Sequence, residues 1–286
     1  MRLVFVHGMR QEGKILADLQ KVWEDALISA WSATGLAKPT YTLEMPFYGD
    51  VLDQMVREVR GSSVGIVARG EGGPQTFTPL EENLIRRMGA KEGVTDADVR
   101  AELGQEVVTR GPANWEWVQS IARVLIRRVP GLGDIGLSFV RQVDAYLTRP
   151  QIGEAVDELV RPCLLRGPTV VVAHSLGTIV SYRLLREADK EADVPLFVTV
   201  GAPLGIDEVK QYLRPPSLRV PLGVTRWLNG TDERDYVALY ARLDRDTFAD
   251  GIENVSDLHN QRSDVHSIVD YLSDSTICRR IQAGLQ

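Results

Sequence analysis

The chain has 286 residues, with 39 acidic and 33 Lys and Arg side chains, and a net charge of −6. This balance argues against a nucleic-acid partner, which needs an excess of positive charge, and two cysteines are too few for a disulfide framework or a Cys-based zinc site. No apolar segment approaches the ~20 residues of a membrane-spanning helix, and the first apolar run is too short for a signal peptide. We therefore expect a cytoplasmic protein with no transmembrane segment, metal or cofactor.

Apolar runs rich in β-branched residues alternate with segments of helical period along the chain. This alternation is typical of an α/β fold with a mostly parallel central sheet, here of about six strands flanked by helices. We expect residues 1–286 to form a single domain. The predicted strands are 2–7, 40–45, 169–174, 196–200 and 224–229, with a weaker one near 251–256.

A helix is predicted between the first two strands. Apolar side chains recur there at helical spacing, and Gly35 can end the helix in the left-handed conformation. The side chains of this stripe are Ile15, Leu16, Leu19, Val22, Trp23, Ala26, Leu27, Ala30 and Trp31.

Approximately residues 50–140 are predicted to form an inserted helical cap or lid. Within it, Thr78-Pro79 followed by acidic residues marks a helix start, and residues 61–75 read as a loop. A second apolar stripe covers 115–129. Two interpretations of that stripe stay open: a lid that covers an acyl pocket or rests on lipid with the help of its arginines, and a cap helix packed on the core. From 139 to 165 the pattern is helical again, with an interruption at Pro150.

The first strand leads into a loop with two interpretations. Gly8, Gly13 and Lys14 have nearly the spacing of a phosphate-binding loop, but such a loop needs Ser or Thr after the lysine, and Ile15 stands there. The alternative is that His7-Gly8 begins a loop that stabilises an oxyanion. We favour the second interpretation.

The most informative segment is TVVVAHSLGTIVSYRLL, residues 169–185. A buried strand, Ser175 and an apolar helix follow one another, which is the order of a nucleophile elbow. The residues two before and two after such a serine must be small so that strand and helix can approach closely. They are Ala173 and Gly177 here, so the motif is A-x-S-x-G instead of the commoner G-x-S-x-G.

With these motifs the chain resembles serine hydrolases of the α/β-hydrolase superfamily, nearer to the lipase-like members than to the peptidases. The resemblance is carried by FVHG (5–8), VVVAHSLGT (170–178), VTVGAPLG (198–205), WLNGTDERDYVA (227–238) and DVHSIVDYL (264–272). It does not extend to the middle of the chain.

The resemblance implies that an acid and then a histidine follow the nucleophile along the chain. Of four histidines, only His259 and His266 follow Ser175. His266 opens a helical pattern after the last predicted strand and is favoured as the base, whereas His259 lies in a polar stretch typical of a solvated loop.

Two acids compete in the loop after strand 224–229. Asp235, followed by Tyr236-Val237-Ala238, resembles the segment around the acid of lipase-like relatives and is favoured. Asp232 remains the alternative, and each could also be a plain turn residue. His7 and His174 are expected to be structural, and Gly201 is expected to form a turn near the site.

The resemblance further assigns the oxyanion-binding N–H groups to Met9 and Leu176. The expected function is a serine hydrolase that cleaves a carboxylic ester, with a small-molecule or lipid ester as substrate and peripheral membrane contact as an option. Acyl transfer or amide hydrolysis by the same residues, and a non-catalytic interaction module, are the alternatives. The sequence indicates neither the substrate chain length nor the oligomeric state.

Overall fold

The computed structural model describes residues 1–60, 77–103, 115–129, 133–214, 217–261 and 263–286, so the predicted loop 61–75 lies outside the described residues. Its centre is a six-stranded sheet in the order β2-β1-β3-β4-β5-β6, in which every neighbouring pair is parallel. The strands are β1 (Arg2–Val6), β2 (Thr42–Glu44), β3 (Thr169–His174), β4 (Leu196–Val200), β5 (Trp227–Gly230) and β6 (Ile252–Val255). The predicted α/β class and the predicted strands are confirmed, although β5 begins three residues late because Val224 makes only an isolated bridge to Val194.

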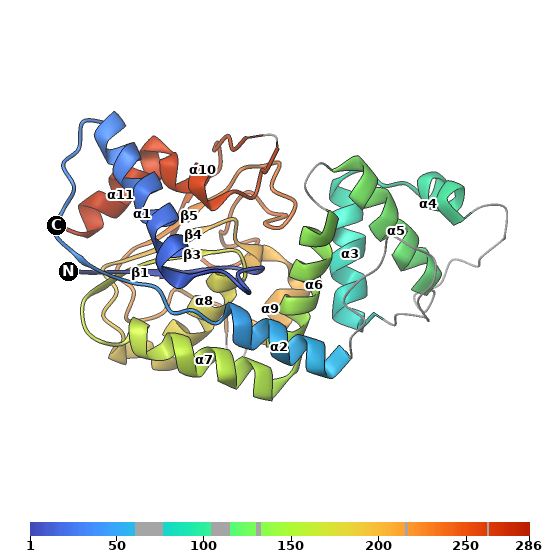
Figure 1. Cartoon of the computed structure of the whole chain (residues 1–286), viewed down its shortest axis with the longest axis horizontal. Coiled ribbons are helices and arrows are strands. Elements are labelled where there is room, and N and C mark those ends of the chain that lie inside the picture. Colours follow the sequence, from blue (N-terminus) through green and yellow to red (C-terminus); the bar gives the residue numbers. More distant parts are fainter. Residues whose placement is uncertain (61–76, 104–114, 130–132, 215–216, 262) are drawn as a thin grey trace.

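Helices cover both faces of this sheet (Figure 1). Those described before β3 are α1 (Leu16–Ala33), α2 (Gly49–Arg60), α3 (Pro79–Lys91), α4 (Asp96–Leu103), α5 (Trp115–Arg128), α6 (Gly133–Thr148) and α7 (Pro150–Leu164). Those after it are α8 (Leu176–Ala188), α9 (Asp207–Leu213), α10 (Ile268–Ser273) and α11 (Ser275–Gly284), with short 3-10 turns at Asp189–Glu191 and Pro203–Gly205.

Alternation along the strands divides the core into two layers. In β1, Leu3 and Phe5 pack with α1, α10 and α11, while Val4 and Val6 belong to the opposite layer with α7 and α8. This follows from the two-residue period of a strand, which points successive side chains to opposite faces. The second layer continues without a break into α3, α5 and α6.

Helix α1 confirms most of the predicted apolar stripe. Trp23, Leu27 and Trp31 are almost fully buried, and Gly35 ends the helix with φ of 72°. The prediction was wrong for Ile15, Leu16 and Val22, which are 66%, 38% and 50% exposed. Ile15 precedes the helix as its N-cap residue, and Val22 lies to one side of the face that α10 and α11 cover.

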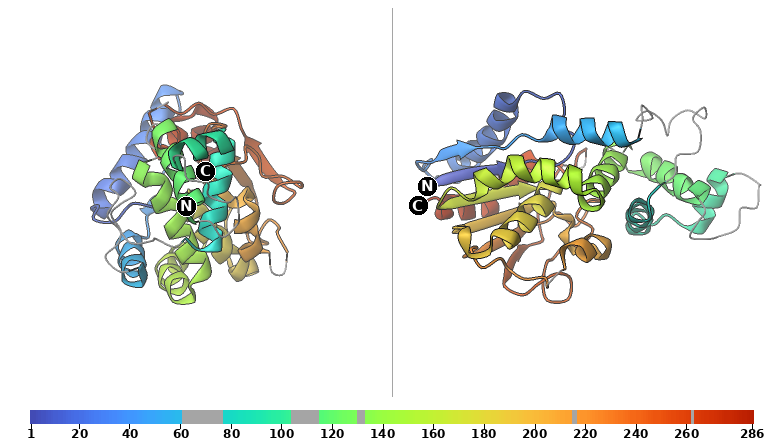
Figure 2. Two further views of the ribbon diagram at one scale, coloured as in Figure 1. Left: turned by 90° about the vertical axis from the view of Figure 1, so that its right-hand side faces the viewer. Right: turned by 90° about the horizontal axis from the view of Figure 1, so that it is seen from below.

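Helices α3, α4 and α5 project beyond the carboxyl ends of the strands (Figures 1 and 2). Helix α3 begins as predicted: the Thr78 hydroxyl accepts from the Glu81 N–H, and the Glu81 carboxylate accepts from the Thr78 N–H at 2.9 Å. In α5, Val118, Ala122 and Leu125 are buried. This stripe therefore packs inside the protein and does not face solvent.

The arginines of α5 pair with α4. Arg127 contacts Glu102, and Arg128 contacts Asp98. Arg123 lies 3.9 Å from the Glu102 carboxylate. These contacts favour the packed cap helix over a lid that uses its arginines on lipid.

The helical pattern predicted from 139 to 165, with an interruption at Pro150, is confirmed by α6 and α7, which meet at Arg149-Pro150. Among the described residues, no helix combines the length and the apolar character that crossing a membrane requires.

Candidate functional site

Ser175 occupies the sharp turn between β3 and α8. Its backbone has φ of 54° and ψ of −127°, a region that costs a non-glycine residue roughly 1–3 kcal/mol and is concentrated at functional sites. The turn is held by the Ser175 N–H, which donates to the Val200 carbonyl at 3.2 Å, and by the Thr178 N–H and hydroxyl, which both donate to the Ser175 carbonyl.

Two glycines make room for this turn. A Cβ on Gly177 would lie 2.3 Å from the Val6 carbonyl oxygen and 2.4 Å from that of His7. A Cβ on Gly8 would lie 2.6 Å from the Ser175 Cβ. Helix α8 thus lies so close to the end of β1, and the loop after β1 so close to the serine, that neither position tolerates a side chain. The contact at Gly177 is the steric reason for the glycine of the A-x-S-x-G pattern.

Asp235 and His266 form a buried pair at the same edge of the sheet. The Nδ1 of His266 lies 2.7 Å from Asp235 Oδ2. The side chain of His266 is 5% exposed and that of Asp235 is fully buried. Asp235 comes from the loop after β5 and His266 from the turn before α10, so the pair joins segments 31 residues apart.

Four donors surround the Asp235 carboxylate. Besides His266, the Tyr271 hydroxyl donates to Oδ2 at 2.7 Å, and the N–H groups of Val237 and Ala238 donate to Oδ1 at 2.8 and 3.3 Å. Burial by itself would raise the pKa of Asp235, but His266 and these hydrogen bonds outweigh burial and hold the pKa below its ordinary value. The carboxylate is therefore ionised at neutral pH.

This ionised partner determines which nitrogen of His266 carries the proton. A carboxylate only accepts, so Nδ1 donates and Nε2 of the neutral ring is left with a free lone pair. His266 Nε2 and Ser175 Oγ are both buried and have no hydrogen-bond partner among the described residues. A hydrogen bond between Ser175 and His266, which the predicted nucleophilic attack would require, is thus not formed here. In active sites without substrate such hydrogen bonds are often long and shorten only when substrate binds.

The ring of His266 lies beside the serine turn. Its centroid is 4.4 Å from the ring centroid of His174, the residue before Ser175. A Cβ on Gly201 would lie 2.9 Å from both His266 Cε1 and Asp235 Oδ2, and Gly201 directly follows Val200, which accepts from the Ser175 N–H. Gly201, with φ of 56°, is therefore in direct contact with the pair. The sequence predicted only a turn near the site at this position.

The alternative acid, Asp232, and the alternative base, His259, are not part of this pair. The Asp232 carboxylate is bidentate to the Arg234 side chain and also accepts from the Asn260 N–H at 2.7 Å, so it braces its own loop. His259 is exposed, as expected of a solvated loop residue.

His7 fixes the loop that carries Met9. The Tyr48 N–H donates to His7 Nε2 at 3.2 Å, so the ring proton is on Nδ1, which donates to the Gly8 carbonyl at 2.8 Å. In a trans peptide the Met9 N–H points opposite to that carbonyl. Burial lowers the pKa of His7 to about 4, so the ring is neutral at neutral pH.

The second candidate donor, the Leu176 N–H, lies in the first turn of α8, where main-chain N–H groups have no partner within the helix and the helix dipole is positive.

His174 also has a structural role. Its Nε2 lies 3.0 Å from the His266 carbonyl, which can only accept, so the ring donates and anchors the main chain of His266. Burial, together with the neighbouring His266, lowers the pKa of His174 well below its ordinary value.

The helix α3 contacts the core beside the candidate acid. Lys91 Nζ donates to the main-chain carbonyl of Asp235 at 2.8 Å. One turn earlier, Arg87 pairs with Asp207 at 2.9 Å and with Glu208 at 2.5 Å, both on α9. Burial lowers the pKa of Lys91, opposed mainly by Asp235.

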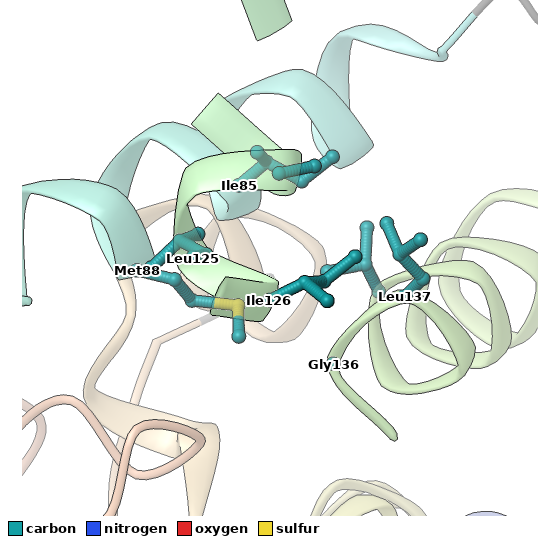
Figure 3. Close-up of a pocket in the computed structure, with 8 residues that line it drawn as sticks. Ile85, Met88, Leu125, Ile126, Gly136 and Leu137 are labelled. Atoms are coloured by element: carbon teal, nitrogen blue, oxygen red, sulfur yellow. The ribbon is translucent and has the colours of Figure 1, made fainter. Parts of the chain in front are cut away.

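A small apolar cavity lies in the cap between α3, α5 and α6 (Figure 3). Met88 lies on its wall and precedes Lys91 by three residues on α3, so the cavity lies about one helical turn from the residue whose side chain contacts the acid loop. The lining residues are Ile85, Met88, Ala122, Leu125, Ile126, Gly136, Leu137 and Val140.

The sequence did not reveal two of these contacts. Tyr271 offered a weak signal, because it lies on the buried face of the helix that His266 precedes. Lys91 offered none, because a lysine in the last turn of a helix is ordinary there. Comparison with known protein families, curated proteins and solved structures found no match to this chain.

Proposed function

We propose that the protein is a serine hydrolase that cleaves a carboxylic ester through an acyl-enzyme. One arrangement supports this function above all. The buried Asp235–His266 pair lies beside the strained Ser175. The two atoms that would exchange a proton, Ser175 Oγ and His266 Nε2, are buried and have no other hydrogen-bond partner in the described part of the chain.

In the proposed reaction, Ser175 Oγ attacks the ester carbonyl carbon while its proton passes to His266 Nε2. The carbonyl oxygen becomes an oxyanion, and the N–H groups of Met9 and Leu176 are the proposed donors to it. His266 then gives the proton to the departing alcohol as the C–O bond breaks. Water repeats the sequence on the acyl-serine and releases the acid. Asp235 stays ionised and stabilises the imidazolium.

The substrate is proposed only as a carboxylic ester. The cap cavity is lined by apolar side chains, but its volume of about 10 Å³ holds about one water molecule and not an acyl chain, so it does not select a chain length.

The decisive experiment is intact-mass spectrometry after treatment with a fluorophosphonate, on wild type, Ser175→Ala and Ser181→Ala. Ser181 is a matched control, because it is also fully buried and its hydroxyl has no hydrogen-bond partner among the residues described, but it lies within α8. We expect one adduct on wild type and Ser181→Ala, and none on Ser175→Ala. A folded wild type that gives no adduct, or an adduct that persists in Ser175→Ala, would refute the proposal, and the first result would favour the non-catalytic interaction module.

A further inference from the structure

The hydroxyl of Tyr271 contacts both acids of the loop after β5. It lies 2.7 Å from Asp235 Oδ2 and 3.2 Å from the main-chain nitrogen of Asp232. A main-chain N–H can only donate, so the hydroxyl oxygen accepts from Asp232. The single hydroxyl proton is then directed at the Asp235 carboxylate.

We infer that Tyr271 is a positioning residue of the candidate active site, whose hydroxyl holds the Asp235 carboxylate ionised and aimed at His266 Nδ1. The inference rests on the proposed function for its catalytic meaning, but its geometric content concerns only the Asp235–His266 pair.

The hydrogen bonds of Asp235 show why the hydroxyl matters. A carboxylate offers about four lone-pair sites, and four donors occupy them: Val237 and Ala238 on Oδ1, His266 and Tyr271 on Oδ2. Rotation of the carboxylate would break several of these bonds at once. Without the hydroxyl, Oδ2 keeps only His266, and both the orientation and the stabilisation of the charge are weakened.

Tyr271 is placed rigidly enough for this task. It is fully buried on α10, whose first turn is capped by Ser267, the residue after His266. Helix α10 packs against α1, and burial together with Asp235 raises the pKa of the Tyr271 hydroxyl well above its ordinary value. The hydroxyl therefore keeps its proton over the pH range in which a hydrolase would be assayed.

Other charged and titratable groups face this pair from several elements, and a pH experiment has to include them. We expect a variant that removes only the hydroxyl to leave their arrangement unchanged. They are His174 at the end of β3, Lys91 on α3, Asp232 and Tyr236 in the acid loop, and Asp264, whose carboxylate accepts from the His266 N–H.

The test is Tyr271→Phe, with kcat/KM for an ester measured across pH. We expect the plateau value of kcat/KM to fall roughly 10-fold, as for the loss of one hydrogen bond to a charged group. The acidic limb should also move to higher pH, because Oδ2 without the Tyr271 hydrogen bond is a stronger acceptor and favours the charged form of the imidazole bonded to it. A plateau that falls while the acidic limb stays in place would reduce Tyr271 to an ordinary core residue and overturn the inference.

Tyr41→Phe is the matched control. The Tyr41 hydroxyl also donates to a carboxylate, that of Glu24 on α1, at 2.8 Å. The pair lies outside the site, so the control should keep both the plateau and the acidic limb of wild type.

Two NMR measurements separate this inference from the proposed function. The carboxyl-carbon titration of Asp235 should move to higher pH in Tyr271→Phe, and an unchanged midpoint would overturn the inference even if the enzyme is active. If Tyr271→Phe fails to fold, the wild type alone decides. The Tyr271 hydroxyl proton should be protected from exchange with solvent and close to the His266 Nδ1 proton. A hydroxyl proton that exchanges rapidly, or that is not close to the Nδ1 proton, would overturn the inference. A wild type that does not react with the fluorophosphonate would refute the proposed hydrolase function. Both NMR measurements would still test the contact between Tyr271 and Asp235.

Discussion

Lys91 Nζ donates a hydrogen bond of 2.8 Å to the main-chain carbonyl of Asp235, across 144 residues of sequence. A side chain at the end of a cap helix thus holds the loop of the candidate acid. The cap and the Asp235–His266 pair are joined by this bond, so a change in one is expected to affect the other.

The first prediction concerns that bond. Lys91→Met keeps the length of the side chain but removes this donor, so the Asp235 carbonyl keeps only the 3.4 Å bond from the Leu239 N–H, and the loss of a partner by a buried group costs about 1–3 kcal/mol. We expect kcat to fall about 10-fold, with a smaller change in KM. Steady-state kinetics with a short-chain ester would check it.

Arg87→Met is the comparison for Lys91→Met. Arg87 joins the same helix to α9 and not to Asp235, so its loss should affect substrate affinity more than kcat. Equal kcat losses in the two variants would show that general docking of the cap, not the contact with Asp235, is responsible.

The second prediction separates the two acids. Asp235→Asn should reduce kcat by about 10⁴-fold, because an amide can donate to Nδ1 and leave His266 in the wrong tautomer. Asp232→Asn should lower the free energy of unfolding by breaking the bidentate contact with Arg234, with much less effect on kcat. Esterase kinetics and urea unfolding on both variants would check it, and the reverse pattern would make Asp232 the acid.

The third prediction concerns Gly201. Gly201→Ala places a Cβ against the Asp235–His266 pair and adds a left-handed backbone penalty of roughly 1 kcal/mol. Gly35→Ala adds the same kind of penalty, with φ of 72° and nothing within 4 Å of the new Cβ. Activity should be lost in Gly201→Ala and kept in Gly35→Ala. Full activity in both would show that the pair tolerates displacement.

The fourth prediction is a pH dependence of stability. The pKa of His7 is about 4 in the folded protein against 6.5 ordinarily, so the unfolded state binds a proton first as pH falls. Stability is complete above pH 6.5 and declines towards pH 4, by about 3 kcal/mol in total from His7. His174, whose pKa is also lowered, acts in the same direction.

The measurement is urea unfolding at pH 7 and pH 5. His7→Asn should be less stable than wild type at pH 7, because the neutral ring makes two hydrogen bonds there, but should lose less stability on going to pH 5. An equal loss in wild type and variant would show that His7 does not titrate in this range.

Local patterns were sufficient for much of this protein. Strand β3, the turn at Ser175 and helix α8 are adjacent in sequence, so their apolar periods and small residues were visible as one motif. The capping box at Thr78 and the helix end at Gly35 are equally local. For Ile15, Leu16 and Val22 the period alone was misleading, because it does not say how wide the covered face of a helix is.

The sequence by itself determined the class of the fold, the sheet strands and the few candidate residues for the proposed hydrolysis. Only the tertiary structure decided which of them meet: that Asp235 and not Asp232 pairs with His266, that Gly201 touches both, and that Tyr271 and Lys91 hold the acid from two other helices. The reason is physical. Secondary structure follows from interactions between near neighbours in the chain, whereas a buried carboxylate takes its donors from whatever segments the packing of the sheet and cap brings to it.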